Sequence, residues 1–280
     1  MTLKILILLI IAVFAVMFVI GNNILTVSYE KFRLDGITEN IKVLQLSDLH
    51  KKQFGKGNKR LIKKIKELSP DIIIMSGDMV SRDSGDFDGY ESLLDGIKDY
   101  RIFACFGNHE TDMPAEMLER YLKISDRYGV KTLVNEFARL ENGLNIAGLA
   151  VEREYYRNSD GSYRNLKEYT IADMKKALGE HSFPVVLLAH NPLFFGVYAD
   201  WGAEIIFSGH VHGGVVRFPF VKGLLSPERK LFPKYSEETY REKNSVMCVS
   251  RGLGKLRLFN PPEIVLAEIE PAQTLSLIHI

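Results

Sequence analysis

The stretch FSGHVHGGVV, residues 207–216, places His210 and His212 one residue apart between glycines. Two imidazoles at this spacing can bind a metal ion together, or they can be ordinary turn residues. Because histidine is the commonest metal ligand among the side chains, the pair favours a metal site. Two ligands do not complete the coordination of an ion, so the rest of the chain must supply others.

Polar side chains of suitable types follow four other apolar runs of the chain. They are Asp48 and His50 after IKVLQLS, Asp78 after DIIIMSG, Asn108, His109 and Glu110 after RIFACFG, and His190 after PVVLLA. Taken singly, each of these residues has a structural alternative as a turn or capping residue. Five of the seven histidines nevertheless follow such a run, whereas His181 lies in an expected loop and His279 near the chain end. The joint pattern favours one shared site.

The donor types indicate which ions would bind there. Carboxylate, amide and imidazole ligands together suit manganese, iron, zinc or cobalt, and the imidazole content is too high for magnesium or calcium. The two cysteines, Cys105 and Cys248, lie in apolar runs, so we expect buried thiols rather than a structural zinc site. One ion does not need all of the candidates, but two ions sharing one bridging carboxylate would use them. Such metal pairs clamp a phosphoryl group and activate water.

The first half of the chain alternates strand-like and helix-like segments. We expect strands within residues 41–50, 71–78 and 101–110, and helices within residues 58–70, 90–100 and 114–129. This order indicates an α/β fold with parallel strands. In such sheets ligands bind beyond the carboxyl ends of the strands, which is where the polar side chains lie.

The second half is expected to be less regular. Residues 130–135, 137–142 and 144–150 have the pattern of a meander or of hairpins, and residues 152–170 that of a long surface loop. Helices at 171–179 and 192–202 then alternate with strands at 183–190 and 203–210, and strands follow at 245–252 and 263–269. We expect a single domain, because no internal repeat or low-complexity segment divides the chain.

The polar motifs, in their order along the chain, resemble those of the calcineurin-like metallophosphoesterases. The motifs are DLH (48–50), GD (77–78), GNHE (107–110), His190 and GHVH (209–212). The segments LLSPERKLFPKY, SRGLG and RLFNPPEIVLAEI further resemble the membrane-associated bacterial branch of YkuE/YaeI-like phosphodiesterases. The resemblance covers residues 27–270 and implies a four-layer αββα sandwich with a dinuclear metal centre.

The resemblance also implies a role for each residue. One ion would be bound by Asp48, His50, Asp78 and His212, and the other by Asp78, Asn108, His190 and His210. Asp78 would bridge the two ions as part of the catalytic centre, and His109 would act as general acid. Asn108, His109 and Arg251 are candidates for substrate binding, with a structural role as the alternative for Arg251. For Glu110 we favour a helix N-terminal carboxylate over a residue that orients His109.

The chain departs from the habit of the family in two places. Lys51 and Lys52 stand where smaller residues are usual, and the segment between Gly254 and Arg257 is short. Neither feature involves an expected metal ligand. We expect both to shape the substrate cleft.

The N-terminal run at residues 3–20 is apolar except for Lys4. At about 1.5 Å per residue it is long enough to cross a bilayer as a helix. A signal peptide has a shorter apolar region and a small-residue cleavage site, so we expect an uncleaved single-pass anchor. Lys4 lies at the start of the run and the next cation, Lys31, follows the run at a distance, which favours an extracytoplasmic domain.

The domain boundaries follow from these segments. We expect the anchor at residues 1–26, the catalytic domain at 27–271 and a tail at 272–280. We interpret residues 274–280 as artificial, because LSLIHI is also the translation, in one frame, of a widely used sequencing adapter.

The combined hypothesis is a membrane-anchored phosphohydrolase with two divalent metal ions that cleaves phosphodiester or pyrophosphate bonds. The anchor, and the aromatic and basic segment 218–235, favour a lipid-linked substrate. A net charge of +1 gives no reason to expect nucleic acid as a partner. The alternatives are a phosphomonoesterase or protein phosphatase, a non-catalytic membrane-tethered metal or phosphate sensor, and, for location, a soluble cytosolic enzyme.

Overall fold

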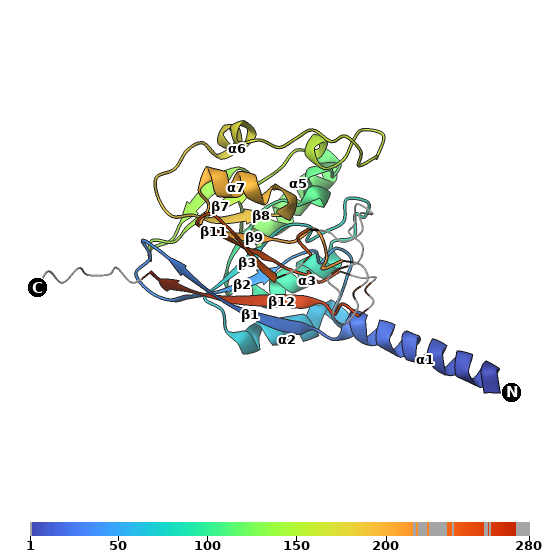
Figure 1. Cartoon of the computed structure of the whole chain (residues 1–280). Coiled ribbons are helices and arrows are strands. Elements are labelled where there is room, and N and C mark those ends of the chain that lie inside the picture. The colour runs from blue at the N-terminus through green and yellow to red at the C-terminus, as the bar shows by residue number, and fades with distance from the viewer. Residues whose placement is uncertain are drawn as a thin grey trace, which may run out of the picture.

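The computed structural model describes residues 2–214, 217, 223, 234–236, 238–254, 257 and 259–272 (Figure 1). Most of the aromatic and basic segment 218–235 lies outside the described residues. The tail 274–280, with His279, also lies outside them, so its interpretation as artificial stays a prediction.

In the described part of the chain, twelve strands form two sheets of six strands each. The first sheet has the order β1 (Thr26–Leu34), β12 (Glu263–Pro271), β2 (Ile41–Leu46), β3 (Ile72–Met75), β4 (Arg101–Ala104) and β5 (Val130–Thr132). The second has the order β10 (Glu238–Glu242), β11 (Ser245–Val249), β9 (Ile205–Ser208), β8 (Val186–Ala189), β7 (Asn145–Leu149) and β6 (Glu136–Arg139).

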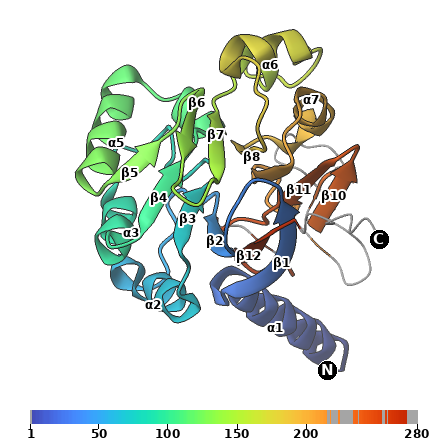
Figure 2. The same cartoon turned by 90° about the vertical axis from the view of Figure 1, so that its left-hand side faces the viewer.

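Helices cover the outer face of each sheet (Figure 2). The first sheet packs against α2 (Lys59–Leu68), α3 (Asp88–Ile97) and α5 (Ala115–Arg127), and the second against α6 (Ile171–Leu178) and α7 (Phe195–Trp201). The described connections also contain one-turn helices, which are η1 (Lys56–Asn58), α4 (Asn108–Thr111), η2 (Arg153–Tyr155) and η3 (Pro192–Phe194). The four-layer αββα sandwich expected from the sequence is confirmed.

The interior strands are continuous apolar runs because both of their faces are buried. In β3, Ile72 and Ile74 belong to the hydrophobic cluster between the two sheets, whereas Ile73 and Met75 belong to the cluster under the outer helices. In β8, Leu188 faces the inner cluster and Leu187 the outer one. Because neighbouring residues of a strand point to opposite faces, each run supplies two core layers.

The structure corrects the expected meander in the middle of the chain. β6 and β7 do form an antiparallel hairpin, but β5 pairs in parallel with β4 in the first sheet. The reason is its position after α5, which makes β5 the return strand of a β–α–β unit. Two strands were not expected at all. β1 and β10 lie at the edges of their sheets, where polar residues interrupt the apolar pattern.

The strands that carry the polar motifs run parallel to one another. β2, β3 and β4 are parallel neighbours in the first sheet, and β8 and β9 in the second. Their carboxyl ends therefore open on one edge of the sandwich.

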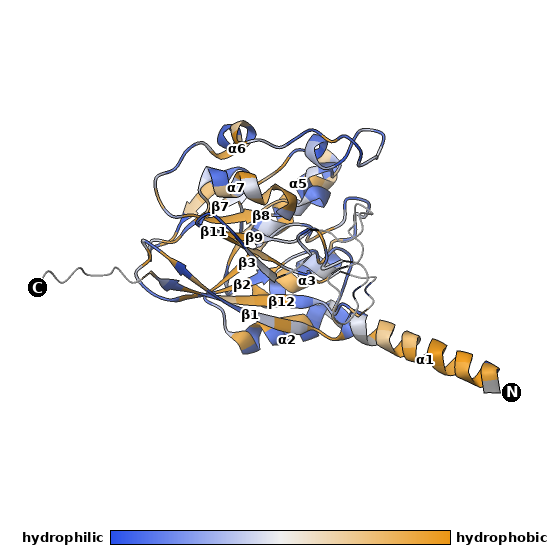
Figure 3. Ribbon diagram, viewed as in Figure 1, coloured by the Kyte–Doolittle hydropathy of each residue, from blue (hydrophilic) through white to orange (hydrophobic). Residues whose placement is uncertain are grey.

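Helix α1 (Thr2–Asn23) projects from the domain (Figures 1 and 3). Its residues Leu3–Asn23 are long and apolar enough to cross a membrane, and the apolar window is not buried against the rest of the chain. An exposed apolar helix of this length is a candidate membrane span or signal sequence.

Candidate metal centre

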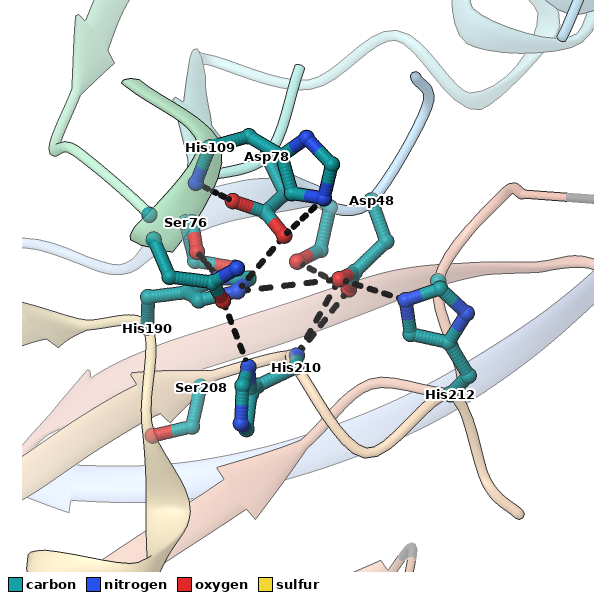
Figure 4. A network of polar contacts seen from close by, with 12 residues as sticks. Asp48, Ser76, Asp78, His109, His190, Ser208, His210 and His212 are labelled. Carbon is teal, nitrogen blue, oxygen red and sulfur yellow. Dashed lines mark hydrogen bonds and ion pairs between the residues drawn. The ribbon is translucent and has the colours of Figure 1, made fainter. Parts of the chain in front are cut away.

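The polar side chains at the strand ends gather at one place between the two sheets (Figure 4). Three groups have donor atoms that all lie within 4.8 Å of one another: Asp48–His50–His212, His50–Asp78–His109 and Asp78–His190–His210. All six of the carboxylate and imidazole ligands expected from the sequence belong to these groups. The amide ligand, Asn108, adjoins them through Oδ1, which lies 2.7 Å from His210 Nδ1.

The Asp48 carboxylate lies between two imidazoles. Its Oδ1 is 3.1 Å from His212 Nε2 and 3.8 Å from His190 Nε2. The same Nε2 atom of His212 lies 3.4 Å from Nε2 of His50. Neutral imidazole nitrogens that converge beside a carboxylate can bind a divalent cation in place of the protons that they lack.

The Asp78 carboxylate is shared by two of the three groups. Its Oδ2 lies 3.2 Å from His190 Nε2, 3.9 Å from His50 Nε2 and 4.0 Å from His109 Nε2. Its Oδ1 accepts a hydrogen bond of 2.8 Å from the backbone N–H of His109, which fixes the orientation of the carboxylate. Asp78 is therefore the carboxylate that these two groups of imidazoles have in common.

His190 is oriented by a backbone carbonyl so that its other nitrogen faces the carboxylates. Nδ1 lies 2.7 Å from the carbonyl oxygen of Ser76, which can only accept, so Nδ1 carries a proton. Nε2 is buried and faces the carboxylate oxygens of Asp78 (3.2 Å) and Asp48 (3.8 Å). A histidine whose Nδ1–H is bound by a carbonyl presents Nε2 as a ligand, which is the usual support of metal-binding histidines. The residues present therefore fit a metal centre.

The backbone at the site is strained. Five expected ligands have left-handed φ angles of 51° to 70°: Asp48, His50, Asp78, His210 and His212. This conformation is unfavourable for residues other than glycine and concentrates at functional sites. The glycines of the motifs allow the loops to approach, because a Cβ atom at Gly107 would overlap the Asp78 carboxylate and one at Gly209 would overlap Ser47 and Asp48.

A comparison of the sequence with models of protein families shows to which family the chain belongs. The model of the family called calcineurin-like phosphoesterase matches residues 41–214, which is more than half of the chain and includes every expected metal ligand. The chain belongs to the calcineurin-like phosphoesterase family. The resemblance inferred from the motifs is confirmed, and a metal-dependent hydrolase of phosphoesters is the enzyme class of this family.

Named relatives of this phosphoesterase are similar over most of their length. The metallophosphoesterase YkoQ of Bacillus subtilis is 26% identical over 241 residues, covering 82% of this chain and 84% of YkoQ. The UDP-2,3-diacylglucosamine pyrophosphatase LpxG of Chlamydia trachomatis is 26% identical, covering 81% and 82%. The phosphodiesterase YaeI of Escherichia coli is 26% identical, covering 81% and 82%.

The electrostatics of the phosphoesterase site favour a cation. Burial opposes the charge on Asp48 and Asp78, but the neighbouring imidazoles outweigh it and lower the pKa of both carboxyl groups. Burial likewise opposes the charge on His190, but Asp78 and Asp48 raise its pKa to about 10. Burial lowers the pKa of His50 to about 4. Without metal, a proton on His190 thus offsets part of the negative charge of the two carboxylates, which a cation would otherwise bind.

His109 has a defined tautomer. The backbone N–H of Arg82 donates to His109 Nδ1 at 3.1 Å, so the ring proton lies on Nε2. Burial lowers the pKa of His109, which keeps the ring neutral. Its side chain is 21% exposed and lines a cavity of about 120 Å³ together with His50, Asp78 and His212. His109 therefore presents an Nε2–H donor to that cavity.

Glu110 supports the site through buried hydrogen bonds, although it does not belong to the groups of expected metal ligands. It is fully buried, and its Oε2 accepts from the N–H groups of Gly107 (2.8 Å) and Asp78 (2.9 Å), while Oε1 accepts from Val80 (3.3 Å). This is the expected helix N-terminal carboxylate, with an added contact to the Asp78 loop. Burial, and then the charge of Asp78, raise the pKa of Glu110 to about 7.

Glu110→Ala should destabilise the fold, because three buried N–H groups lose their acceptor. The expected loss in the free energy of unfolding is about 3 kcal/mol or more. Chemical denaturation of the full chain measures it. Glu116→Ala is the matched control, since Glu116 also lies in the first turn of a helix but is exposed; a change of no more than about 1 kcal/mol is expected there. Equal effects of the two substitutions would contradict the supporting role.

The structure does not bring Arg251 to the cavity. Its Nη2 donates to Glu263 Oε1 (2.8 Å) and Thr26 Oγ1 (3.2 Å), so the side chain joins the ends of β11, β12 and β1. The cavity instead has other basic and aromatic side chains that the sequence did not single out: Arg82, Tyr156, Arg157 and Tyr163. Arg82 lies four residues after Asp78, and the other three lie in the expected long loop.

The two unusual lysines lie outside this cavity. Lys51 pairs with Asp83 at 3.2 Å on the surface. Lys52 is 6% exposed, and its Nζ donates to the carbonyl oxygen of Asn22 at the end of α1. The sequence suggested that these lysines shape the substrate cleft, but the structure places Lys52 under the N-terminal helix.

Proposed function

We propose that this chain is a membrane-anchored phosphohydrolase with two divalent metal ions that cleaves phosphodiester or pyrophosphate bonds of a lipid-linked substrate. The observation that supports it most is the sharing of one buried carboxylate, Asp78, by two groups of imidazoles. A binding module needs no such pair of sites next to a hydrogen-bond donor such as His109.

Asp48, His50, Asp78 and His212 would hold one ion, and Asp78, Asn108, His190 and His210 the other. Manganese, iron, zinc and cobalt all suit these donors. The bound cations would supply an activated water and neutralise charge on the oxygens of the phosphoryl group.

The protein side chains at the cavity have distinct tasks. His109 Nε2–H can donate to the oxygen of the leaving group as negative charge develops there. Its Nδ1 is held by the Arg82 backbone, so the ring cannot turn away without losing that bond. Tyr156 Oη donates to the carbonyl oxygen of Asn108 (3.3 Å), which ties the long loop to the metal site.

Arginines at the cavity favour an anionic substrate larger than one phosphoryl group. Arg82, Arg153 and Arg157 all face the single carboxylate of Asp112, at 3.3, 3.1 and 3.8 Å. Three guanidinium groups around one carboxylate leave positive charge in surplus, and Arg82 and Arg157 line the cavity. A pyrophosphate diester would present a second anionic group to this surplus.

Arg157→Ala should therefore raise KM more for a pyrophosphate diester than for a simple phosphodiester. We expect an increase of roughly tenfold for the pyrophosphate, since a charged hydrogen bond contributes about 1.5–3 kcal/mol, and a change of about twofold for the diester. Arg153→Ala is the matched control, because Arg153 pairs with the same Asp112 but does not line the cavity. An equal change for both substrates would argue against a pyrophosphate preference.

The lipid-linked substrate rests on the helix and on two relatives. α1 is a candidate anchor, and LpxG and YaeI are named as a pyrophosphatase of a diacylated nucleotide sugar and as a phosphodiesterase. The buried bonds of Asn22 to the domain support an uncleaved helix, because signal-peptide cleavage would remove them. We place the chain in the cell membrane with its domain on the extracytoplasmic side, from the position of Lys4 at the N-terminal end of the span.

The function is tested with the full chain in detergent, loaded with manganese. The panel comprises bis(p-nitrophenyl) phosphate, p-nitrophenyl phosphate, a phospholipid and a nucleoside diphosphate-linked lipid. We expect turnover of the diester and the highest kcat/KM on the lipid-linked anhydride. A preference for the monoester would instead indicate a phosphomonoesterase. Bound metal without turnover of any compound would indicate a sensor, and indifference to both lipids would exclude the lipid-linked substrate.

A further inference from the structure

The C-terminal end of α1 is bound to the domain through a buried asparagine. Asn22 is 7% exposed, and its Nδ2 donates to the carbonyl oxygen of Arg257 at 2.8 Å. In return, the backbone N–H of Arg257 donates to Asn22 Oδ1 at 3.1 Å. In these two bonds the side-chain amide of Asn22 pairs with the backbone of Arg257 as a second strand would. The bonds join residues 235 positions apart in the sequence.

Two cations bind the carbonyl groups that the helix end leaves without helical partners. Lys52 Nζ donates to the carbonyl oxygen of Asn22 at 2.5 Å, and Arg60 Nη1 donates to that of Asn23 at 3.2 Å. The last carbonyls of a helix carry its negative dipole end and favour such partners. This bond to the end of α1 explains why a lysine occupies position 52, where smaller residues are usual in the family.

These contacts continue to the loop of His212. The side chain of Arg257 is 1% exposed, and it donates to the carbonyl oxygens of Gly254 (2.8 Å) and Arg251 (2.6 Å) and, more weakly, of His212 (3.4 Å). Asn260, in the same segment, donates to the carbonyl oxygen of His212 at 2.6 Å. The segment that contacts the end of α1 therefore also binds the backbone of His212, an expected metal ligand.

The same contacts continue to His50. Lys52 lies two residues after His50 in one loop, so the bond to Asn22 fixes the loop that carries this imidazole. Gly254 lies beside both ligands, since a Cβ atom there would lie 3.4 Å from His50 Cδ2 and 3.6 Å from His212 Cε1. A second contact along α1, between the rings of Phe14 and Phe259 (6.1 Å), keeps the loop against the helix.

We propose that the last turn of α1 is part of the support of one metal position, and that Asn22 is a positioning residue for His50 and His212. The anchor then does more than hold the enzyme at a membrane, because it organises the ion bound by Asp48, His50 and His212. The inference rests on the proposed function for the assignment of these ligands to one ion. The other ion's ligands Asn108 and His190 follow β4 and β8, and among the described residues their side chains bond to Ser76 and His210 rather than to α1.

The test compares two neighbouring asparagines in the full chain. Asn22→Ala removes the two side-chain bonds to Arg257 and one to Phe18 of the same helix, whereas Asn23→Ala removes only a bond from the exposed side chain to Val19 of the same helix. Each substitution is combined with His190→Ala, which leaves the His50–His212 position, and with His212→Ala, which leaves the His190 position. Manganese affinity is measured by calorimetry in detergent, so the readout does not depend on turnover.

With His190→Ala we expect Asn22→Ala to weaken manganese binding about 3–10-fold, near the lower range for residues that orient metal ligands. With His212→Ala we expect no change, and Asn23→Ala should have no effect in either background. No effect of Asn22→Ala, or an equal effect in both backgrounds, would overturn the proposal. If Asn22→Ala does not fold, Lys52→Met removes the His50 side of the same contacts and is judged by the same outcomes. A lack of manganese binding by the unsubstituted chain would count against the proposed function instead.

Discussion

Asp78→Asn should lower kcat by roughly a hundredfold or more and remove at least one of the two bound metal ions, since it removes the charge that both ions would share. The two side chains have the same shape, so the fold should persist. The asparagine oxygen would be retained by the N–H of His109, as Oδ1 is now, and the amide NH₂ would then replace the oxygen that faces His190 and His50. A donor at that place repels a cation.

The matched control is Asp83→Asn, five residues further along the same loop. Asp83 pairs with Lys51 on the surface and its side chain is 70% exposed, so kcat and metal content should not change. The measurements are kcat, metal content by elemental analysis and the midpoint of thermal unfolding. If Asp78→Asn kept full activity and both ions, Asp78 would not be a bridging ligand.

His109→Ala should lower kcat by about 10²–10³ on substrates with an alkyl leaving group and leave the metal content unchanged. The reason is the Nε2–H donor that the Arg82 backbone holds toward the cavity. A nitrophenolate leaving group is stable without a hydrogen bond, so the loss on nitrophenyl substrates should be about tenfold or smaller.

The dependence on the leaving group separates this role from that of a metal ligand. A ligand would lower activity on all substrates alike and would release metal. His181→Ala is the control, since its imidazole packs against Trp201 and lies away from the cavity. An equal loss on alkyl and nitrophenyl esters, together with lost metal, would assign His109 to the metal shell.

The metal site could be predicted from the sequence because each of its residues lies in a recognisable local sequence pattern. Each expected ligand directly follows an apolar run, and parallel strands bring such ends to one edge of a sandwich. The strained backbone at these positions could be anticipated only from the glycines of GD, GNH and GHVH, which mark close approaches.

The contacts that support the metal site could not be predicted from the sequence, because they join residues that lie far apart in the chain and have no distinctive type. Asn22 and Arg257 are common polar residues, and only the fold shows that each completes the hydrogen bonds of the other. The same holds for Arg157 and Asp112, which come from a loop and a one-turn helix end. The edge strands β1 and β10 were missed for a different reason, since their partly exposed faces carry polar residues that resemble loop sequence.

The central claim is that these side chains hold two metal ions that share Asp78. Electron paramagnetic resonance of the manganese-loaded full chain, with elemental analysis of the same sample, tests it most directly. We predict two manganese ions per chain with the spectrum of a spin-coupled pair, and loss of the coupling in Asp78→Asn. A single isolated manganese ion, two uncoupled ions, or none would contradict the account.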